Sequence, residues 1–144
     1  MAKILITELE GSALNWAVAK CEGKNGVLHD DGITRCIVIA AASGVYKGTY
    51  QPSVNWSQGG PIIDRECIGC VPSQSEYDNE PGLRLENWCA KIWMRDKTEP
   101  IYGYGPTALV SAMRCFIASK SEEKWIEVPD ELLEEPAAIE RPKG

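Results

Sequence analysis

The sequence predicts a small single domain of the α+β class, in which two main helices and a short helix pack on a small β-sheet. Its 144 residues suit one domain with one core. Hydrophobic residues make up 44% of the chain and charged residues 25%, close to the composition of folded globular proteins. Segments with helical spacing are interspersed with short apolar runs typical of strands. We expect the domain to span residues 1–129 and an acidic, partly disordered tail to span 130–144.

The N-terminal region predicts a strand followed by a helix. Residues 1–6 suit a short strand or a lead-in to the helix. Thr7 and Glu10 have the spacing of a capping box, in which two side chains satisfy free backbone amides at a helix start. The helix should run to about Glu22, where Gly23 provides a natural end. Its apolar positions recur at helical spacing: Leu14, Ala17, Val18 and Cys21.

The middle of the chain predicts one buried strand and one short helix. Residues 24–32 are polar and indicate a turn region, whereas residues 35–41 are apolar enough for a buried strand. The glycine-rich residues 44–52 suit a hairpin or an ordered loop. Pro61 is expected at the first position of a short helix over 59–66, because its missing amide proton is not needed there.

The C-terminal half predicts the strongest helix. Residues 71–82 read as a surface loop and residues 88–94 as a strand. A helix should open at residues 105–107 and run to about Lys120, because Leu109, Ala112, Met113 and Phe116 form an apolar stripe. The remaining expectations are a strand over 124–128, a short helix over 130–135 and a disordered tail over 137–144.

Charge and apolar content exclude two classes of function. The chain lacks an apolar run long enough to cross a membrane and an N-terminal signal peptide, so we expect a cytoplasmic protein. The net charge of −6 argues against direct nucleic-acid binding, which requires a basic face. Much of this charge is local, since eight acidic residues and a single lysine lie between Glu122 and Glu140.

The six cysteines are expected to be reduced thiols. Cys67 and Cys70 form a Cys-x-x-Cys pair, but a zinc site needs four ligands and the chain has one histidine, His29. A redox pair usually lies at the start of a helix, whereas this pair follows a predicted helix. We therefore expect no metal and no cofactor.

Three segments resemble a known family. They read LNWAVAKCEG over residues 14–23, YQPSVNWSQGGPIID over 50–64 and YGPTALVSAMRCFIASK over 104–120, and Val128-Pro129 follow the last one. In this order they resemble the NinX-like phage proteins, a family of unknown function found in tailed phages and prophages. The resemblance implies a phage origin and a setting in the host cytoplasm, and it implies no activity.

Two Gly-Pro segments at expected helix starts are candidate ligand sites. Helix N-termini carry free amides and a partial positive charge that favour phosphates and carboxylates, and nearby aromatic rings can stack on a base. Arg114 lies at helical spacing from Thr107 and Ser111 and could add a charge. The ordinary alternative is that Gly-Pro simply starts a helix. The candidate ligand-binding residues are Trp56, Gly59, Gly60, Tyr102, Tyr104, Gly105, Pro106, Thr107 and Arg114.

The sequence contains no recognisable catalytic constellation. His29 is followed by Asp30 and Asp31, but adjacent residues rarely converge on one point, so we expect no enzyme. The leading hypothesis is a phage accessory binding protein that sequesters a small anionic or nucleotide ligand to counter host defence. The alternatives are a protein–protein inhibitor of a host factor and, third, a weak hydrolase. A closed pocket lined by Tyr104, Thr107 and Arg114 would favour the first hypothesis, and exposed aromatic pairs would favour the inhibitor. The sequence leaves the oligomeric state open, including a homo-oligomer.

Overall fold

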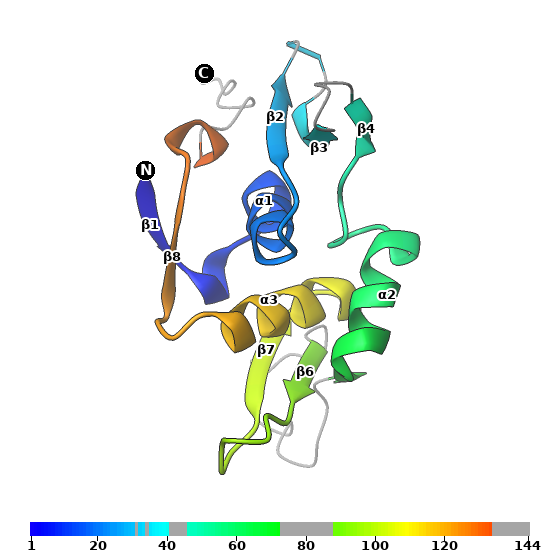
Figure 1. Ribbon diagram of the computed structural model, residues 1–144, viewed down its shortest axis with the longest axis vertical. Coiled ribbons are helices and arrows are strands. Elements are labelled where there is room, and N and C mark those ends of the chain that lie inside the picture. Colours follow the sequence, from blue (N-terminus) through cyan, green and yellow to red (C-terminus); the bar gives the residue numbers. More distant parts are fainter. Residues whose placement is uncertain (31, 34, 41–45, 73–87, 134–144) are drawn as a thin grey trace, which may run out of the picture.

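A computed structural model describes residues 1–30, 32–33, 35–40, 46–72 and 88–133 (Figure 1). Helices and strands are interspersed along the chain, and this confirms the α+β class. The elements are β1 (Ala2–Leu5), η1 (Ile6–Glu8), α1 (Gly11–Cys21), β2 (Gly26–Asp30), β3 (Arg35–Ala40), β4 (Tyr46–Thr49), α2 (Trp56–Glu66), β5 (Gly69–Pro72), β6 (Trp88–Ile92), β7 (Ile101–Gly105), α3 (Ala108–Lys120), β8 (Trp125–Val128) and η3 (Asp130–Leu133).

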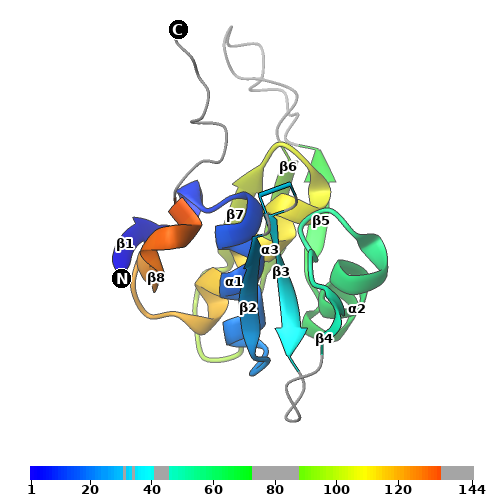
Figure 2. The ribbon, with the colours of Figure 1, turned by 90° about the horizontal axis from the view of Figure 1, so that it is seen from above.

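The described strands form three small antiparallel sheets instead of a single one. Their orders are β2-β3-β4, β5-β6-β7 and β1-β8. The first sheet lies against α1, α1 packs on α3, and α3 covers the second sheet (Figure 1). Seen from above, α2 lies on one side of this stack and the β1–β8 pair on the other (Figure 2). The molecule therefore has two helices sandwiched between two sheets.

Helix α3 is the centre of the core. Its residues Ala112, Met113, Phe116 and Ile117 are fully buried. Strand β7 lies directly on this helix at Gly103, where a Cβ atom would collide with the backbone of Ser111 and Cys115. Only glycine permits so close an approach of a strand to a helix. The main expected helix is thus confirmed, and its close packing on β7 requires a residue without a side chain at position 103.

The start of α1 differs from the expected capping box. Thr7 lies in η1, and α1 begins at Gly11 after Glu10, whose side chain makes no capping hydrogen bond. The cause is burial of Leu9, which is fully inaccessible in an extended backbone between the two helical segments. Gly23 has a φ angle of +75° and ends the helix as predicted.

The polar segment expected to be a turn contains strand β2. Val27 pairs with Val38 and Asp30 pairs with Arg35 along an antiparallel ladder, so β3 supplies the partner that a single sequence does not show. Strand β3 confirms the expected buried strand. Strand β4 pairs with β3 and realises the hairpin option for 44–52, although residues 41–45 lie outside the described part.

Helix α2 begins five residues before Pro61, so the expectation that this proline opens the helix is wrong. Asn55 caps the helix, because its side-chain oxygen accepts a hydrogen bond of 2.9 Å from the amide of Ser57. Pro61 is exposed inside the helix, where it lacks one backbone donor. A Cβ atom at Gly59 would collide with the carbonyl of Pro52 and with Leu109, so this glycine lets α2 pack closely on its neighbours.

The C-terminal expectations are largely confirmed where the structure describes them. Strand β6, helix α3, strand β8 and the short helical segment at Asp130 are present, whereas β5 and β7 were not expected. Positions 71 and 72, expected to begin a surface loop, belong to β5 because they pair with β6. Most of the expected loop over 71–82 and the tail over 137–144 lie outside the described residues. Leu132 is buried in the core, so packing continues past position 129. None of the described helices is long and apolar enough to span a membrane.

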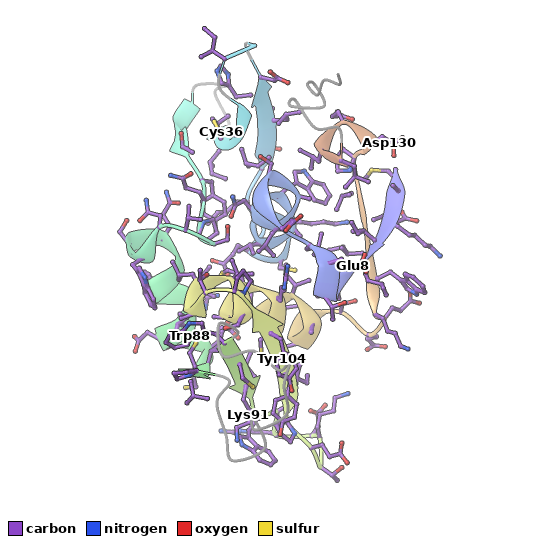
Figure 3. All side chains as sticks on the ribbon, turned by 180° about the vertical axis from the view of Figure 1, so that it is seen from behind. Glu8, Cys36, Trp88, Lys91, Tyr104 and Asp130 are labelled. Atoms are coloured by element: carbon purple, nitrogen blue, oxygen red, sulfur yellow. The ribbon has the colours of Figure 1, made fainter. Side chains whose placement is uncertain are left out.

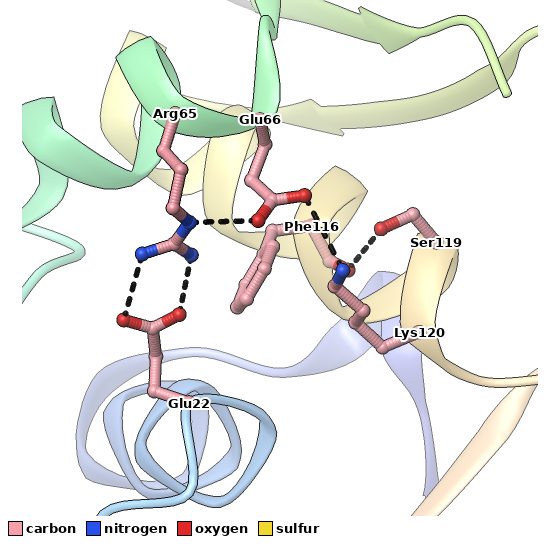
Figure 4. A network of polar contacts seen from close by, with 6 residues as sticks. All are labelled: Glu22, Arg65, Glu66, Phe116, Ser119 and Lys120. Atoms are coloured by element: carbon pink, nitrogen blue, oxygen red, sulfur yellow. Dashed lines mark hydrogen bonds and ion pairs between the residues drawn. The ribbon is translucent and has the colours of Figure 1, made fainter.

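Four charged side chains join the ends of three helices (Figure 4). Arg65 of α2 donates to both carboxylate oxygens of Glu22, which follows α1, and to Glu66 at 2.9 Å. Lys120 of α3 lies 3.3 Å from Glu66. The Arg65 and Lys120 cations also lie over the ring of the buried Phe116, at 5.9 and 5.5 Å from its centroid. This network covers the core where the three helices meet.

Candidate functional site

The structure divides most of the nine predicted site residues between two separate hollows. Tyr102, Tyr104 and Arg114 line the larger hollow. Trp56 and Thr107 line a smaller one, where the first turns of α2 and α3 meet. The glycines 59 and 105 are buried and serve close packing. Tyr104 and Arg114 therefore share one hollow, whereas Thr107 lines the other.

The larger hollow, here the Tyr–Arg pocket, has a volume of about 370 Å³ and lies between η1, β7 and the connection from α3 to β8. Its size falls within the range of about 300–1,000 Å³ that is typical of small-molecule sites. It is lined by Leu5, Ile6, Thr7, Tyr102, Gly103, Tyr104, Arg114, Ala118, Ser121, Glu122, Glu123 and Lys124. Segments from both ends of the described chain meet here because β1 pairs with β8.

Arg114 forms one wall of the Tyr–Arg pocket and is tied to the backbone. Its Nε donates to the carbonyl of Leu9 at 2.9 Å, and its Nη1 donates to the carbonyl of Tyr104 at 2.8 Å. Burial lowers the pKa of the guanidinium, while the charge of Glu10 acts in the opposite direction. Arg114 therefore links the end of η1, α3 and β7.

Ser111 does not extend a ligand face from Arg114. It is fully buried, and its hydroxyl donates to the carbonyl of Ala108 at 2.9 Å. The predicted spacing of Thr107, Ser111 and Arg114 is present in α3, but the packing of α3 on β7 turns Ser111 into the core. Arg114 remains the polar residue of this group that borders the Tyr–Arg pocket.

Tyr102 and Tyr104 form an exposed aromatic pair. Alternation along β7 sends Gly103 toward α3 and both tyrosines outward, where they are 48% and 50% exposed. Their ring centroids lie 6.2 Å apart with an angle of 18° between the planes, a stacked arrangement. Tyr104 and Lys91 lie on the same sheet (Figure 3). Partial burial and the neighbouring Cys89 raise the pKa of Tyr104, so its hydroxyl stays neutral at physiological pH.

The smaller hollow, here the helix-start hollow, has a volume of about 210 Å³. Two helix N-termini converge on it, as the anion-site hypothesis requires, but each is already capped. Asn55 accepts from the amide of Ser57, and the Thr107 hydroxyl accepts from the amide of Val110 at 3.1 Å. The hollow is lined by Ser53, Val54, Trp56, Thr107, Ala108 and Leu109. Fewer free amides are therefore left for an anion than the sequence suggested.

Three of the remaining predicted residues are not among the lining of either hollow. Gly60 faces Trp56, whose nearest ring atom is 3.9 Å from an added Cβ. Pro106 is exposed between β7 and the cap of α3. Gly105 is buried, and a Cβ there would press on Val110. Whether any of these residues touches a ligand stays a prediction.

The Cys-x-x-Cys pair is split between two environments. Cys67 is exposed at the end of α2, and Cys70 is half-buried in β5, where burial raises the pKa of its thiol. No group of three or more metal-binding side chains occurs among the described residues. His29 lies in β2 opposite Cys36, away from this pair.

Residues 6–120 match a family model described as "Bacteriophage P22, NinX". The chain belongs to this family. The matched span contains all nine predicted site residues and most of the lining of the Tyr–Arg pocket. No curated protein matches the chain. The family assignment places the protein among phage proteins and leaves its biochemical role to be inferred from the two hollows.

The sequence did not point to all of the pocket lining. Residues 5–7 and 121–124 were not expected to meet, because they are far apart in the chain and belong to segments read as a lead-in and a strand. The only available signal was the apolar character of Ile4 and Ile126, which face each other in the β1–β8 ladder. Such long-range pairing is not encoded in local spacing.

Proposed function

We propose that the protein is a phage accessory binding protein that acts in the host cytoplasm and holds a small, negatively charged ligand with a planar ring, such as a nucleotide, in the Tyr–Arg pocket. One observation carries the proposal. The half-buried guanidinium of Arg114 and the stacked rings of Tyr102 and Tyr104 line the same cavity. Rings suit stacking on a base, and a guanidinium suits a phosphate.

The charge of Arg114 is available to a ligand. Its two hydrogen bonds go to backbone carbonyls, and in the part of the chain that the structure describes it forms no ion pair with a carboxylate. A guanidinium has five N–H donors, so these two bonds leave others unused. Glu122, Glu123 and Lys124 also line the pocket. The mixed charges favour a ligand with one or two negative groups over a polyanion.

The side chains that line the Tyr–Arg pocket support a role in sequestering a ligand. Aromatic rings, a guanidinium and an ammonium provide stacking and charge-assisted hydrogen bonds, which are binding interactions. We therefore place the protein among binding proteins rather than enzymes. For a phage protein, removal of a small host signal would counter host defence, and such a role requires affinity without turnover.

Ligand release and calorimetry test the proposal. Protein purified from infected cells is denatured, and the released small molecules are identified by mass spectrometry. Calorimetric titration of that compound then compares native protein with Tyr104→Ala, which should bind roughly tenfold or more weakly because a stacked ring contributes about 1–3 kcal/mol. Trp93→Ala is the control, since Trp93 is exposed outside the pocket. Equal affinity of Tyr104→Ala and native protein would remove the pocket from consideration.

The outward face of the β5–β6–β7 sheet supports a second candidate, an inhibitor of a host protein. Val71 of β5 and Trp93, which directly follows β6, are 57% and 63% exposed. Exposed aromatic residues are enriched at protein interfaces. Cross-linking in infected cells, followed by mass spectrometry, should then capture one host protein with the native chain and little of it with Trp93→Ala. Identical capture by both would count against this candidate.

A further inference from the structure

A third hollow lies against α1. It has a volume of about 320 Å³ and is lined by Met1, Trp16, Lys20, Lys24, Asn25 and Gly26. We call it the Trp–Lys hollow. Trp16 and Lys20 are one helical turn apart on α1, and Lys24 follows the end of this helix. Gly26 begins β2 beside Trp16, since an added Cβ would lie 3.9 Å from the indole ring.

The two lysines of this hollow carry charge that the described part of the protein does not neutralise. The Lys20 ammonium lies 5.3 Å from the centre of the Trp16 ring, and the Lys24 ammonium lies 6.0 Å from the Tyr50 ring. Neither forms an ion pair with a described carboxylate. Glu22 lies between them in sequence, but its carboxylate is bound by Arg65. A cationic site therefore persists in a chain whose net charge is −6.

The end of α1 does not need these ammonium groups. Lysines often lie near helix C-termini because they offset the partial negative charge of free carbonyls. Here backbone amides already bond to those carbonyls, since Gly23 donates to Lys20 at 3.1 Å and Lys24 donates to Ala19 at 2.8 Å. The side chains of Lys20 and Lys24 are therefore not required by the helix end, and both residues line the hollow together with Trp16.

We propose that the Trp–Lys hollow is a second ligand site, which binds a free mononucleotide by stacking its base on Trp16 and holding its phosphate between Lys20 and Lys24. A ring with an adjacent anionic group matches a hollow that is lined by one indole and two lysines. The acidic chain disfavours a long nucleic-acid strand, whose backbone would be repelled beyond the hollow. This site goes beyond the proposed function, because it shares no lining residue with the Tyr–Arg pocket.

Calorimetric titration with adenosine 5′-monophosphate tests the site. Lys20→Gln/Lys24→Gln should bind the nucleotide roughly tenfold more weakly than native protein, because two charge-assisted contacts are lost. The matched control is Lys91→Gln/Lys97→Gln, which changes the net charge equally at exposed positions outside the hollow. Circular dichroism confirms that each variant is folded. The control should bind like native protein, and an equal loss in both doubles would overturn the site in favour of bulk charge.

Two further variants test whether the Trp16 ring contributes to binding and whether the nucleotide binds in the Tyr–Arg pocket instead. Trp16→Leu keeps an apolar side chain and should weaken adenosine 5′-monophosphate by roughly fivefold or more, while leaving any binding of inorganic phosphate unchanged. Tyr104→Ala should leave this affinity unchanged. Loss with Tyr104→Ala alone would place the nucleotide in the Tyr–Arg pocket and overturn the second site. Absence of nucleotide binding, or full binding by Trp16→Leu, would also overturn it.

Discussion

Cys67 ends α2 in a backbone conformation that suits glycine. Its φ angle is +56°, and it is the only described residue other than glycine with a positive φ. The amide of Ile68 bonds to the carbonyl of Ile63, and the amide of Cys67 bonds to that of Asp64. Gly23 ends α1 with the same pair of bonds, so the two helices use one motif with different residues.

This comparison predicts that Cys67→Gly stabilises the fold. A side chain in the left-handed region costs about 1 kcal/mol, and glycine removes that strain. Urea unfolding should therefore give a free energy of unfolding that is higher by up to about 1 kcal/mol. The reverse substitution, Gly23→Ala, should lower it by a similar amount. A destabilised Cys67→Gly variant would mean that the thiol itself makes a stabilising contact.

At the scale of elements, the close contact of β7 with α3 depends on Gly103. A methyl group there would meet backbone atoms of Ser111 and Cys115, which cannot rotate away as a side chain can. We predict that Gly103→Ala lowers the free energy of unfolding by about 1–3 kcal/mol, the range for overpacked cores. Gly69→Ala is the control, because an added Cβ there meets nothing within 4 Å. Thermal unfolding of both variants measures the difference.

The elements that the sequence predicted well are those whose apolar spacing matches their final packing. Helix α3 and strand β3 carry strong local patterns and were confirmed. Strand β7 was missed because its inward positions are Gly103 and Gly105, which look like turn residues but serve close packing. Strand β2 was missed because its polar composition hides a ladder formed with β3. Tertiary contacts decided these cases.

Tertiary contacts also decided where the predicted site residues lie. Tyr102, Tyr104 and Arg114 were predicted together from neighbouring positions, and they do share a cavity. The sequence placed Thr107 with them, but a capping hydrogen bond holds its hydroxyl against the start of α3 instead. The helical spacing of Arg114 did not reveal that its side chain reaches the carbonyls of Leu9 and Tyr104.

At the scale of the whole molecule, the network of Glu22, Arg65, Glu66 and Lys120 makes stability depend on pH. Burial would raise the pKa of Glu66, but hydrogen bonds from Arg65 and Lys120 outweigh it and lower the pKa. A carboxyl whose pKa is lower in the folded state stabilises the fold above its unfolded pKa of about 4.3. This contribution is lost as the pH falls through the folded pKa.

We therefore predict that acid weakens the link between the three helices. The urea midpoint of native protein should fall when the pH is lowered from 7 to about 3, and Glu66→Gln should show a smaller fall because it has no proton to gain there. Glu99→Gln is the control, since Glu99 is exposed and lies outside the network. Parallel curves for native protein and Glu66→Gln would rule out this role of the network.

The central position of α3 also sets the order in which parts of the protein open over time. This helix packs on β5, β6, β7, α1 and α2, so its amide protons should exchange with solvent only when the whole molecule unfolds. The β2–β3–β4 sheet rests on α1 and should exchange earlier. A ligand bound beside Arg114 would then slow amide hydrogen exchange mainly by raising the free energy of global unfolding. A ligand at the Trp–Lys hollow, where Gly26 begins β2, would slow exchange in that sheet first, so the timing of protection would reveal which site is filled.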